Sequence, residues 1–207
     1  LKTQEYLSLF LEHGLNPEIG FDAATLDQAS KEEFMDVFAA FRERGRCITC
    51  HAPFLDLSAG SLDPAVRSVT RMRLEQTLDA VACFHPMTVV CHTGWDHRRY
   101  SAFRGVWLER SLEVWAWFAE ALQDRGARLM LENVYERSPE ELFECCDSLR
   151  GAGVGVCLDT GHLSAFAEDP LDRWLDVLMQ DIGQIHLHDT HGDRDEHLAI
   201  GRGIVDF

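Results

Sequence analysis

Residues 184–197 read Gln-Ile-His-Leu-His-Asp-Thr-His-Gly-Asp-Arg-Asp-Glu-His, with four histidines and three aspartates among fourteen positions. The stretch opens with apolar residues that alternate with His186 and His188, which predicts a strand with both imidazoles on one face. A polar loop follows and ends in Asp195 and His197. Imidazole and carboxylate groups together suit Zn²⁺, Mn²⁺ or Fe²⁺. A solvated, histidine-rich loop would have the same composition, so the rest of the chain must distinguish the two.

The chain is acidic, with 19 Lys and Arg against 35 Asp and Glu, a formal net charge of −16 and a pI near 4.9. Such a surface repels phosphate backbones and disfavours a nucleic-acid partner, although a local basic loop could suffice. No apolar run is long enough for a bilayer and no signal-peptide pattern opens the sequence, so we expect no membrane partner. Cys50, Cys91 and Cys157 lie in apolar runs as free thiols would, which predicts a reducing, cytoplasmic location.

Strand-like and helical segments alternate along the chain. The predicted strands cover residues 18–22, 47–51, 87–92, 128–132, 154–159 and 184–188, and the predicted helices cover 1–13, 31–44, 63–83, 106–124, 138–150 and 169–180. Residues 93–104 are predicted to be a loop. The alternation indicates parallel strands joined by helical crossovers, in a single α/β domain over residues 1–207.

Five successive strand ends carry a ligand-type side chain. They are His51, His92, Glu132, Asp159 with His162 close behind, and His186. A closed barrel places all its carboxyl strand ends on one rim, where these side chains would converge, whereas an open doubly wound sheet would spread them along an edge. We therefore expect a (β/α)8 TIM barrel. Six strands are recognised where a barrel has eight, so we expect the first and last strands to be missing from this chain, with a shortened, open barrel as the alternative.

The motifs at these strand ends resemble those of a known superfamily. In chain order they are His51-Ala-Pro, Val90-Cys-His92, Leu131-Glu132-Asn133, Asp159-Thr-Gly-His162, His186-Leu-His-Asp189, Asp195-x-His197 and Gly201-x-Gly203-x-x-Asp206-Phe207. Their order and spacing resemble the xylose-isomerase-like TIM barrels. That superfamily joins sugar and sugar-phosphate isomerases and epimerases with the endonuclease IV-type apurinic nucleases of AP endonuclease family 2.

The resemblance implies a metal site whose form depends on the branch. In the nuclease branch three zinc ions would be held, one by His51, His92 and Glu132, one by Glu132, Asp159 and His186, and one by His162, Asp195 and His197. In the isomerase and epimerase branch one divalent metal (Zn²⁺, or Mn²⁺ or Mg²⁺) would sit on Glu132, Asp159 and His186, and His162 would contact substrate. Both branches add a glutamate on the last strand, which this chain does not reach.

Two departures from the nuclease pattern favour the sugar branch, as does the net charge. Glu132-Asn133 is followed by bulky residues where the nucleases have a glycine-containing stretch, and the segment between His186 and Asp195 is shorter. The complete histidine set points towards the nuclease. We therefore expect an isomerase or epimerase of a small sugar or sugar phosphate, with a zinc apurinic endonuclease as the alternative and a metal-binding barrel without catalysis as a third class.

Candidate roles follow from this chemistry. Glu132 would act as ligand or base beside a metal-polarised carbonyl, and neutral His162 would hold a substrate hydroxyl. Arg98 and Arg99, with Arg104 nearby, would receive a phosphate or carboxylate unless they form a solvated loop. Trp95 would stack on a sugar face unless it serves packing. His188 is expected to line the substrate site, and Asp189 to orient a metal-bound imidazole.

Overall fold

The computed structural model describes residues 2–207 and contains one sheet of six strands. They are β1 (Glu18–Gly20), β2 (Thr49–His51), β3 (Thr88–His92), β4 (Arg128–Glu132), β5 (Gly155–Asp159) and β6 (Ile182–His186). Every neighbouring pair is parallel, and the order of the strands in the sheet is their order in the chain. A doubly wound sheet would reverse that order at a switch point, so the sheet is wound in one direction, as the predicted barrel requires.

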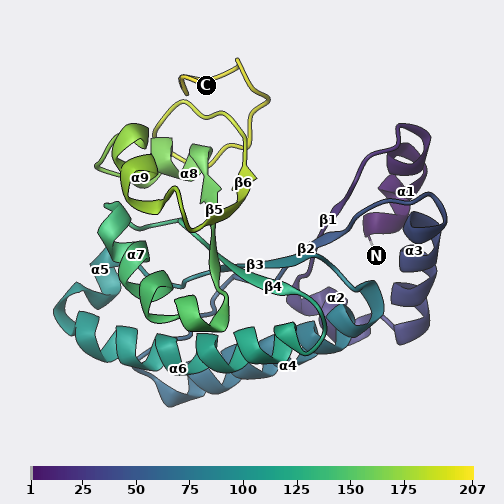
Figure 1. Cartoon of the computed structure of the whole chain (residues 1–207), viewed down its shortest axis with the longest axis horizontal. Helices are drawn as coiled ribbons and strands as arrows, with labels where there is room; N and C mark the ends of the chain where they lie inside the picture. The colour runs from purple at the N-terminus through teal and green to yellow at the C-terminus, as the bar shows by residue number, and fades with distance from the viewer. Residues whose placement is uncertain (1) are drawn as a thin grey trace.

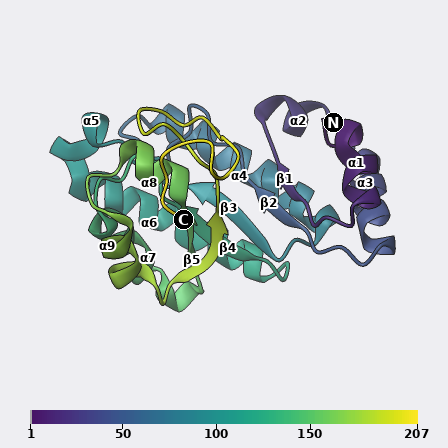
Figure 2. The ribbon, with the colours of Figure 1, turned by 90° about the horizontal axis from the view of Figure 1, so that it is seen from above.

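Helices connect and cover the strands (Figure 1). They are α1 (Lys2–Glu12), α2 (Ala23–Gln28), α3 (Lys31–Glu43), α4 (Pro64–Phe84), α5 (His97–Tyr100), α6 (Arg104–Gln123), α7 (Pro139–Ser148), α8 (Thr160–Phe166) and α9 (Leu171–Leu178), with short 3₁₀ turns at Ser101–Phe103 and Arg150–Ala152. Seen from above, α1 to α3 gather at the β1 edge and α7 to α9 at the β6 edge (Figure 2). The long helices α4 and α6 lie along one side of the sheet, and the C-terminal segment lies on the opposite side, beside β5 and β6.

Helix starts follow from local capping chemistry. The Ser30 hydroxyl accepts from the Glu33 amide at 3.2 Å and the Glu33 carboxylate accepts from the Ser30 amide at 2.8 Å, which is the capping box expected for α3. Asp63 caps α4 through the Ala65 amide at 2.8 Å, with proline in the first turn. Ser138, by contrast, makes no side-chain hydrogen bond at the start of α7.

The sequence interpretation was wrong in several details. It did not predict α2 and α8, and it assigned residues 93–104 to a loop that in fact contains α5 and a 3₁₀ turn. The strand β6 ends at His186, so His188 lies beyond the sheet and not on it. The helix predicted over residues 1–13 is α1 within the described residues, and Leu1 lies outside them.

The sheet is packed on both faces. Its outward residues and the helices form the main hydrophobic core, while Val90, Met130 and Cys157, one each from β3, β4 and β5, form a separate inner cluster. Because side chains alternate along a strand, the residues two positions further on, His92, Glu132 and Asp159, point to this same inner face at the carboxyl ends. Among the described residues, no helix combines the length and apolarity needed to cross a membrane.

Candidate functional site

A single buried carboxylate lies at the centre of the strand ends. Glu132 is 1% exposed, and its Oε2 lies 3.0 Å from His51 Nε2 and 3.1 Å from His92 Nε2. Its Oε1 lies 2.7 Å from His186 Nδ1. Four strands, β2, β3, β4 and β6, thus bring these four side chains together as the sequence predicted, and we refer to them as the Glu132 cluster.

Burial and mutual contact set opposite charge preferences within the Glu132 cluster. Burial would raise the pKa of Glu132, but hydrogen bonds from three imidazoles outweigh it and hold the pKa well below its ordinary value. Burial lowers the pKa of His92, which favours the neutral imidazole. Burial also acts to lower the pKa of His186, but its hydrogen bond with Cys157 and those that its ring donates to the Glu132 and Glu18 carboxylates outweigh it and raise the pKa. Contacts within the cluster therefore favour the ionised form of Glu132 and shift the pKa values of His92 and His186 in opposite directions.

Glu18 contacts His186 of the Glu132 cluster, and the sequence interpretation assigned it no role. Its Oε1 lies 3.1 Å from His186 Nε2, and its other oxygen accepts from the Thr49 hydroxyl at 3.2 Å. Glu18 begins β1, whereas His186 ends β6, so the contact spans the inner space between the two edge strands. No local pattern signals this pairing, because the partners are far apart in sequence and lie on opposite edges of the sheet.

Asp159 and His162 extend the site from β5 into α8. The Asp159 carboxylate accepts from the His162 amide at 2.7 Å and caps the helix. The side-chain amide of Asn133 accepts a hydrogen bond of 2.8 Å from the backbone amide of Asp159 and donates one of 3.0 Å to its backbone carbonyl. The backbone carbonyl oxygen of Asn133 also lies 2.9 Å from His162 Nδ1, which fits an Nδ1–H donor and turns Nε2 towards the site, 3.4 Å from Asp195 Oδ2. This positioning role of Asn133 is a feature that the sequence interpretation missed.

A second group of ligand-type side chains lies beside the first. His162, His188, Asp195 and His197 each offer a ligand atom within 4.8 Å of the others, and we call them the tail cluster. Asp195 Oδ2 lies 3.4 Å from His162 Nε2 and 3.1 Å from His197 Nε2. The sequence interpretation gave His188 to the substrate, whereas the structure places it in this group.

The donors fit a divalent cation. Within the described residues, three further sets of side chains offer ligand atoms that lie within 4.8 Å of one another. The sets are His51 with His92 and Glu132, then Glu132 with Cys157 and His186, and finally Glu132 with Asp159 and His162. Buried carboxylate oxygens and imidazole nitrogens that face one another are the donor types of Zn²⁺ and Mn²⁺ sites. Asp189, by contrast, does not orient an imidazole. Its carboxylate accepts hydrogen bonds of 2.7–3.0 Å from the backbone amides of Thr190, Gly201, Gly203 and Val205. Desolvation acts to raise the pKa of Asp189, but these hydrogen bonds outweigh it and lower the pKa to about 2.

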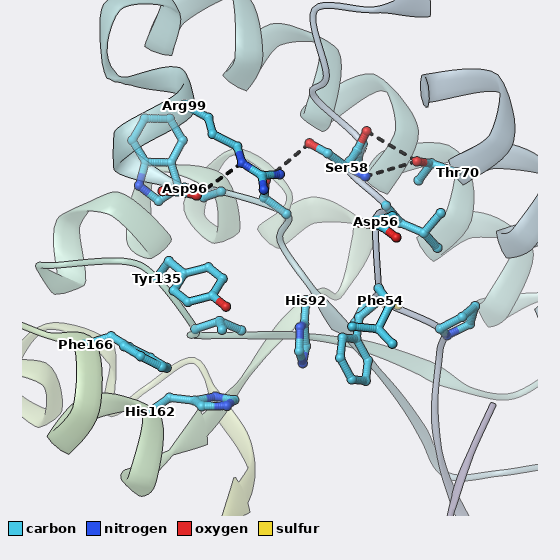
Figure 3. Close-up of a pocket in the computed structure, with 18 of the residues that line it drawn as sticks. Phe54, Asp56, Ser58, Thr70, His92, Asp96, Arg99, Tyr135, His162 and Phe166 are labelled. Carbon is cyan, nitrogen blue, oxygen red and sulfur yellow. Dashed lines mark hydrogen bonds and ion pairs between the residues drawn. The ribbon is translucent and has the colours of Figure 1, made fainter. Parts of the chain in front are cut away.

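A pocket of about 300 Å³ opens beside His92, His162 and Asp195 (Figure 3). The Phe54 ring stacks on His92 with centroids 4.2 Å apart, on one side of the pocket. The rings of Tyr135 and Phe166 lie together on another side, 5.0 Å apart. The volume is at the small end of the range for ligand sites, and the aromatic walls suit a compact organic ligand.

The rim of the pocket carries the arginines selected from the sequence. Arg98 and Arg99 each place Nε within 3.4 Å of the Asp96 carboxylate, and their side chains are 79% and 72% exposed. Arg104 turns away to ion-pair with Glu141 and Glu144 on α7. The first two therefore remain accessible to an anionic group in the pocket, and the third does not.

Trp95 also lines the pocket but is 3% exposed. Its ring packs at 4.9 Å against Trp107, and its Nε1 donates to the Glu141 carboxylate at 3.2 Å. Such enclosure fits the packing role that the sequence interpretation kept open, in preference to stacking on a sugar.

Comparisons with known proteins agree on one family. A family model described as xylose isomerase-like TIM barrel matches residues 17–207. The TTHB071 protein from Thermus thermophilus, solved after soaking with ZnCl₂, is 31% identical with a TM-score of 0.80, over 97% of this chain and 79% of that one. A D-tagatose 3-epimerase-like protein has a TM-score of 0.75 over 91% of this chain and 73% of that one, and its 24% identity is a likeness of fold alone.

Curated sequences give more distant matches. An uncharacterized protein of Methanocaldococcus jannaschii, MJ1311, is 29% identical over 77% of this chain. A probable endonuclease 4 of Mycobacterium leprae is 28% identical over 75% of this chain. The chain spans 57% of the first relative and 64% of the second.

Proposed function

Because the chain belongs to the xylose isomerase-like TIM barrel family, we propose that it is a metal-dependent isomerase or epimerase of a small sugar or sugar phosphate. The observation that supports this most is the pocket of about 300 Å³ with aromatic walls, which has His92 and His162 in its lining. A polar ligand in this pocket would lie beside the Glu132 cluster. A pocket of this size suits a small molecule and leaves little room for a polymer.

The residues divide the chemistry between them. A divalent cation held by Glu132, Asp159 and His186 would polarise a substrate carbonyl and stabilise the negative charge that develops on its oxygen. Glu132 is better suited to a ligand than to a base, since its lowered pKa makes it a weak proton acceptor. His162 can accept a hydrogen bond from a substrate hydroxyl at Nε2, because its Nδ1 is taken up by the Asn133 carbonyl.

The pocket walls would orient a substrate and exclude water. Phe54, Tyr135 and Phe166 present ring surfaces on which the apolar face of a sugar can pack. Arg98 and Arg99 stand at the rim with guanidinium groups largely in solvent, where they can meet a phosphate. These two guanidinium groups give the pocket of a strongly acidic protein a local positive charge, and this charge suits a substrate with an anionic end.

A phosphodiester hydrolase is the second candidate. The tail cluster favours it, because this group supplies the further cation ligands that phosphate-ester hydrolysis would use beside the Glu132 cluster. The likeness to the endonuclease 4 sequence points the same way. The net charge of −16 opposes a DNA substrate, since affinity for DNA depends on neutralised phosphates.

The test compares both reactions on the full-length protein. Ketoses and aldoses, with and without a phosphate, are incubated with Mn²⁺, Mg²⁺ or Zn²⁺ and product sugars are separated by chromatography. An abasic-site DNA duplex is tested in parallel. We expect sugar turnover to fall by about 100-fold or more in Glu132→Gln, because a neutral amide is a weaker cation ligand than a carboxylate and no longer accepts hydrogen bonds from all three imidazoles. The matched control, Glu140→Gln, changes an exposed glutamate of α7 and should leave turnover unchanged. Cleavage of abasic DNA with no turnover of any sugar would replace this proposal with the second candidate.

A further inference from the structure

The imidazole ring of His186 has a carboxylate beside each of its two nitrogens. Nδ1 lies 2.7 Å from Glu132 Oε1, whereas Nε2 lies 3.1 Å from Glu18 Oε1. A histidine binds a cation through an unprotonated nitrogen, and a neutral imidazole carries its one proton on the other nitrogen. The neighbours of the ring therefore decide which nitrogen is available to a cation.

The side of the ring that carries Nδ1 faces the carboxylates on which the proposed cation would sit. Besides Glu132, Asp159 lies on this side, with its Oδ2 3.7 Å from Nδ1. An ion held by these two carboxylates would meet Nδ1 and not Nε2. Glu18 lies on the other side of the ring, and among the described residues it belongs to none of the sets whose ligand atoms lie within 4.8 Å of one another. Glu18 is thus placed to act on the imidazole and not as a ligand of the same ion.

Neighbouring side chains hold the carboxylate of Glu18 in place. Its Oε2 accepts hydrogen bonds from the Thr49 hydroxyl at 3.2 Å and from the Gln184 side-chain amide at 2.5 Å. Both donors belong to strands of the sheet, β2 and β6. Oε1 is the nearer oxygen to His186 Nε2, at 3.1 Å against 3.3 Å for Oε2. One oxygen is therefore held by uncharged donors while the other is turned towards the imidazole, which is the arrangement that an acceptor for Nε2–H requires.

We propose that Glu18 is a positioning residue, which accepts the Nε2–H of His186 and so presents Nδ1 to a cation beside Glu132. Metal-bound histidines usually donate their second N–H to a carboxylate or a carbonyl, and this contact fixes the tautomer and the orientation of the ring. The assignment rests on the cation of the proposed function, but it holds for either candidate reaction and for any substrate.

A charged partner distinguishes His186 from two other imidazoles of the site. His51 Nδ1 lies 2.8 Å from the backbone carbonyl oxygen of Ala52. His162 Nδ1 lies 2.9 Å from that of Asn133. These carbonyls are neutral, whereas an ionised carboxylate is a stronger acceptor and makes the imidazole a more basic ligand. We therefore expect the negative charge of the carboxylate, and not only its oxygen, to contribute to the affinity for the cation.

Zinc binding to the full-length protein tests the assignment. The equivalent of zinc that His186→Gln loses identifies the site, and its affinity is measured by competition with a chromophoric chelator. We expect Glu18→Leu to weaken this affinity by about 10- to 100-fold and Glu18→Gln by a smaller factor, because the amide keeps an acceptor without the charge. Thr88→Val is the matched control and should keep the wild-type affinity, because the Thr88 hydroxyl donates to Gln184 at 2.6 Å, one residue further from His186 in the same inner network.

Heteronuclear NMR of the zinc-loaded protein with labelled histidines keeps the outcome clear if Glu18→Leu folds poorly. For His186 we expect zinc on Nδ1 and a proton on Nε2, and this proton should move upfield in Glu18→Gln because a neutral amide is a weaker acceptor. Zinc on Nε2, or an unchanged proton resonance in Glu18→Gln, would overturn the role of Glu18.

The affinities separate this role from the proposed function. Equal zinc affinity in Glu18→Leu and the wild type, or an equal loss in Thr88→Val, would overturn the positioning role and leave the proposed function standing. A wild-type protein that binds no divalent cation would overturn both.

Discussion

Glu136 is a buried carboxyl whose ionisation should make stability depend on pH. It is 2% exposed, and its oxygens accept hydrogen bonds from the Thr93 hydroxyl and, at 2.7 Å, from the Val134 amide. Burial raises its pKa from 4.5 to about 7, although these bonds act in the opposite direction. The folded protein therefore binds this proton more tightly than the unfolded chain does, so the stabilisation is complete below pH 4.5 and is lost as pH rises through 7.

The size of the effect follows from the two pKa values. At 1.36 kcal/mol per pH unit, ionisation of Glu136 lowers the free energy of unfolding by about 3 kcal/mol in total, of which about 2.5 kcal/mol falls between pH 5 and pH 8. Glu136→Gln cannot ionise, but its amide can still accept from Val134 and donate to Thr93. The difference in unfolding free energy between wild type and variant should therefore shift by about 2.5 kcal/mol in favour of the variant over this interval.

Urea unfolding followed by tryptophan fluorescence, at pH 5, 6, 7 and 8, measures this difference. All other titrating groups are common to the two proteins and cancel. For a chain of this length the shift corresponds to roughly 5–10 °C in the midpoint of thermal unfolding. Glu140→Gln, an exposed change on α7, should show no such trend. A difference between wild type and Glu136→Gln that stays constant from pH 5 to pH 8 would refute the reasoning.

Three further predictions concern the site. Gly161→Ala should lower stability by about 1–3 kcal/mol through overpacking, because a Cβ added at Gly161 would lie 2.0 Å from the His188 ring. The same change in a His188→Ala background should cost much less, and equal costs in a double-mutant cycle would contradict the close approach. Asp189→Asn should expose residues 190–198 to limited proteolysis at neutral pH. Because the pKa of Asp189 is lowered to about 2, the stabilisation that its ionised carboxylate gives is present above pH 4 and is lost as pH falls towards 2. A cleavage rate that is the same in Asp189→Asn and in the wild type at neutral pH would contradict this role. Arg98→Ala with Arg99→Ala should raise KM for a phosphorylated substrate at least 10-fold and leave KM for the unphosphorylated sugar unchanged, and an equal rise for both would argue against phosphate recognition.

The fold could be predicted from the sequence because strand ends have a fixed geometry. Parallel strands wound in one direction bring their carboxyl ends to one rim, so His51, His92, Glu132 and Asp159 could be placed together from the positions at which apolar runs stop. The structure also brings His186 to Glu132, as the alternation in β6 required. These predictions needed only the period of two and the direction of the strands.

Other parts of the site depend on contacts that no local period encodes. Glu18 contacts His186 across the inner space between β1 and β6, which are the two edge strands of the sheet. A sequence pattern along one strand carries no information on the distance between two edge strands. His188 was predicted to share a face with His186, but the strand ends there and the chain turns away. The pocket walls were missed for a similar reason. Tyr135 and Phe166 follow different strands, and only the packing of their loops brings the rings together.

The segment Asp159-Thr-Gly-His162 shows how two clusters are joined without a loop. The strand β5 ends at Asp159 and α8 begins at the next residue, so the carboxylate that caps the helix also lies 2.9 Å from His188. Thr160 donates to the two backbone carbonyls of His186 and His188, at 3.3 Å each, which holds the chain after β6 close to the helix. Gly161 leaves room for the ring that this closeness brings in. The end of β5 therefore places a carboxylate beside the Glu132 cluster and also contacts and supports the tail cluster.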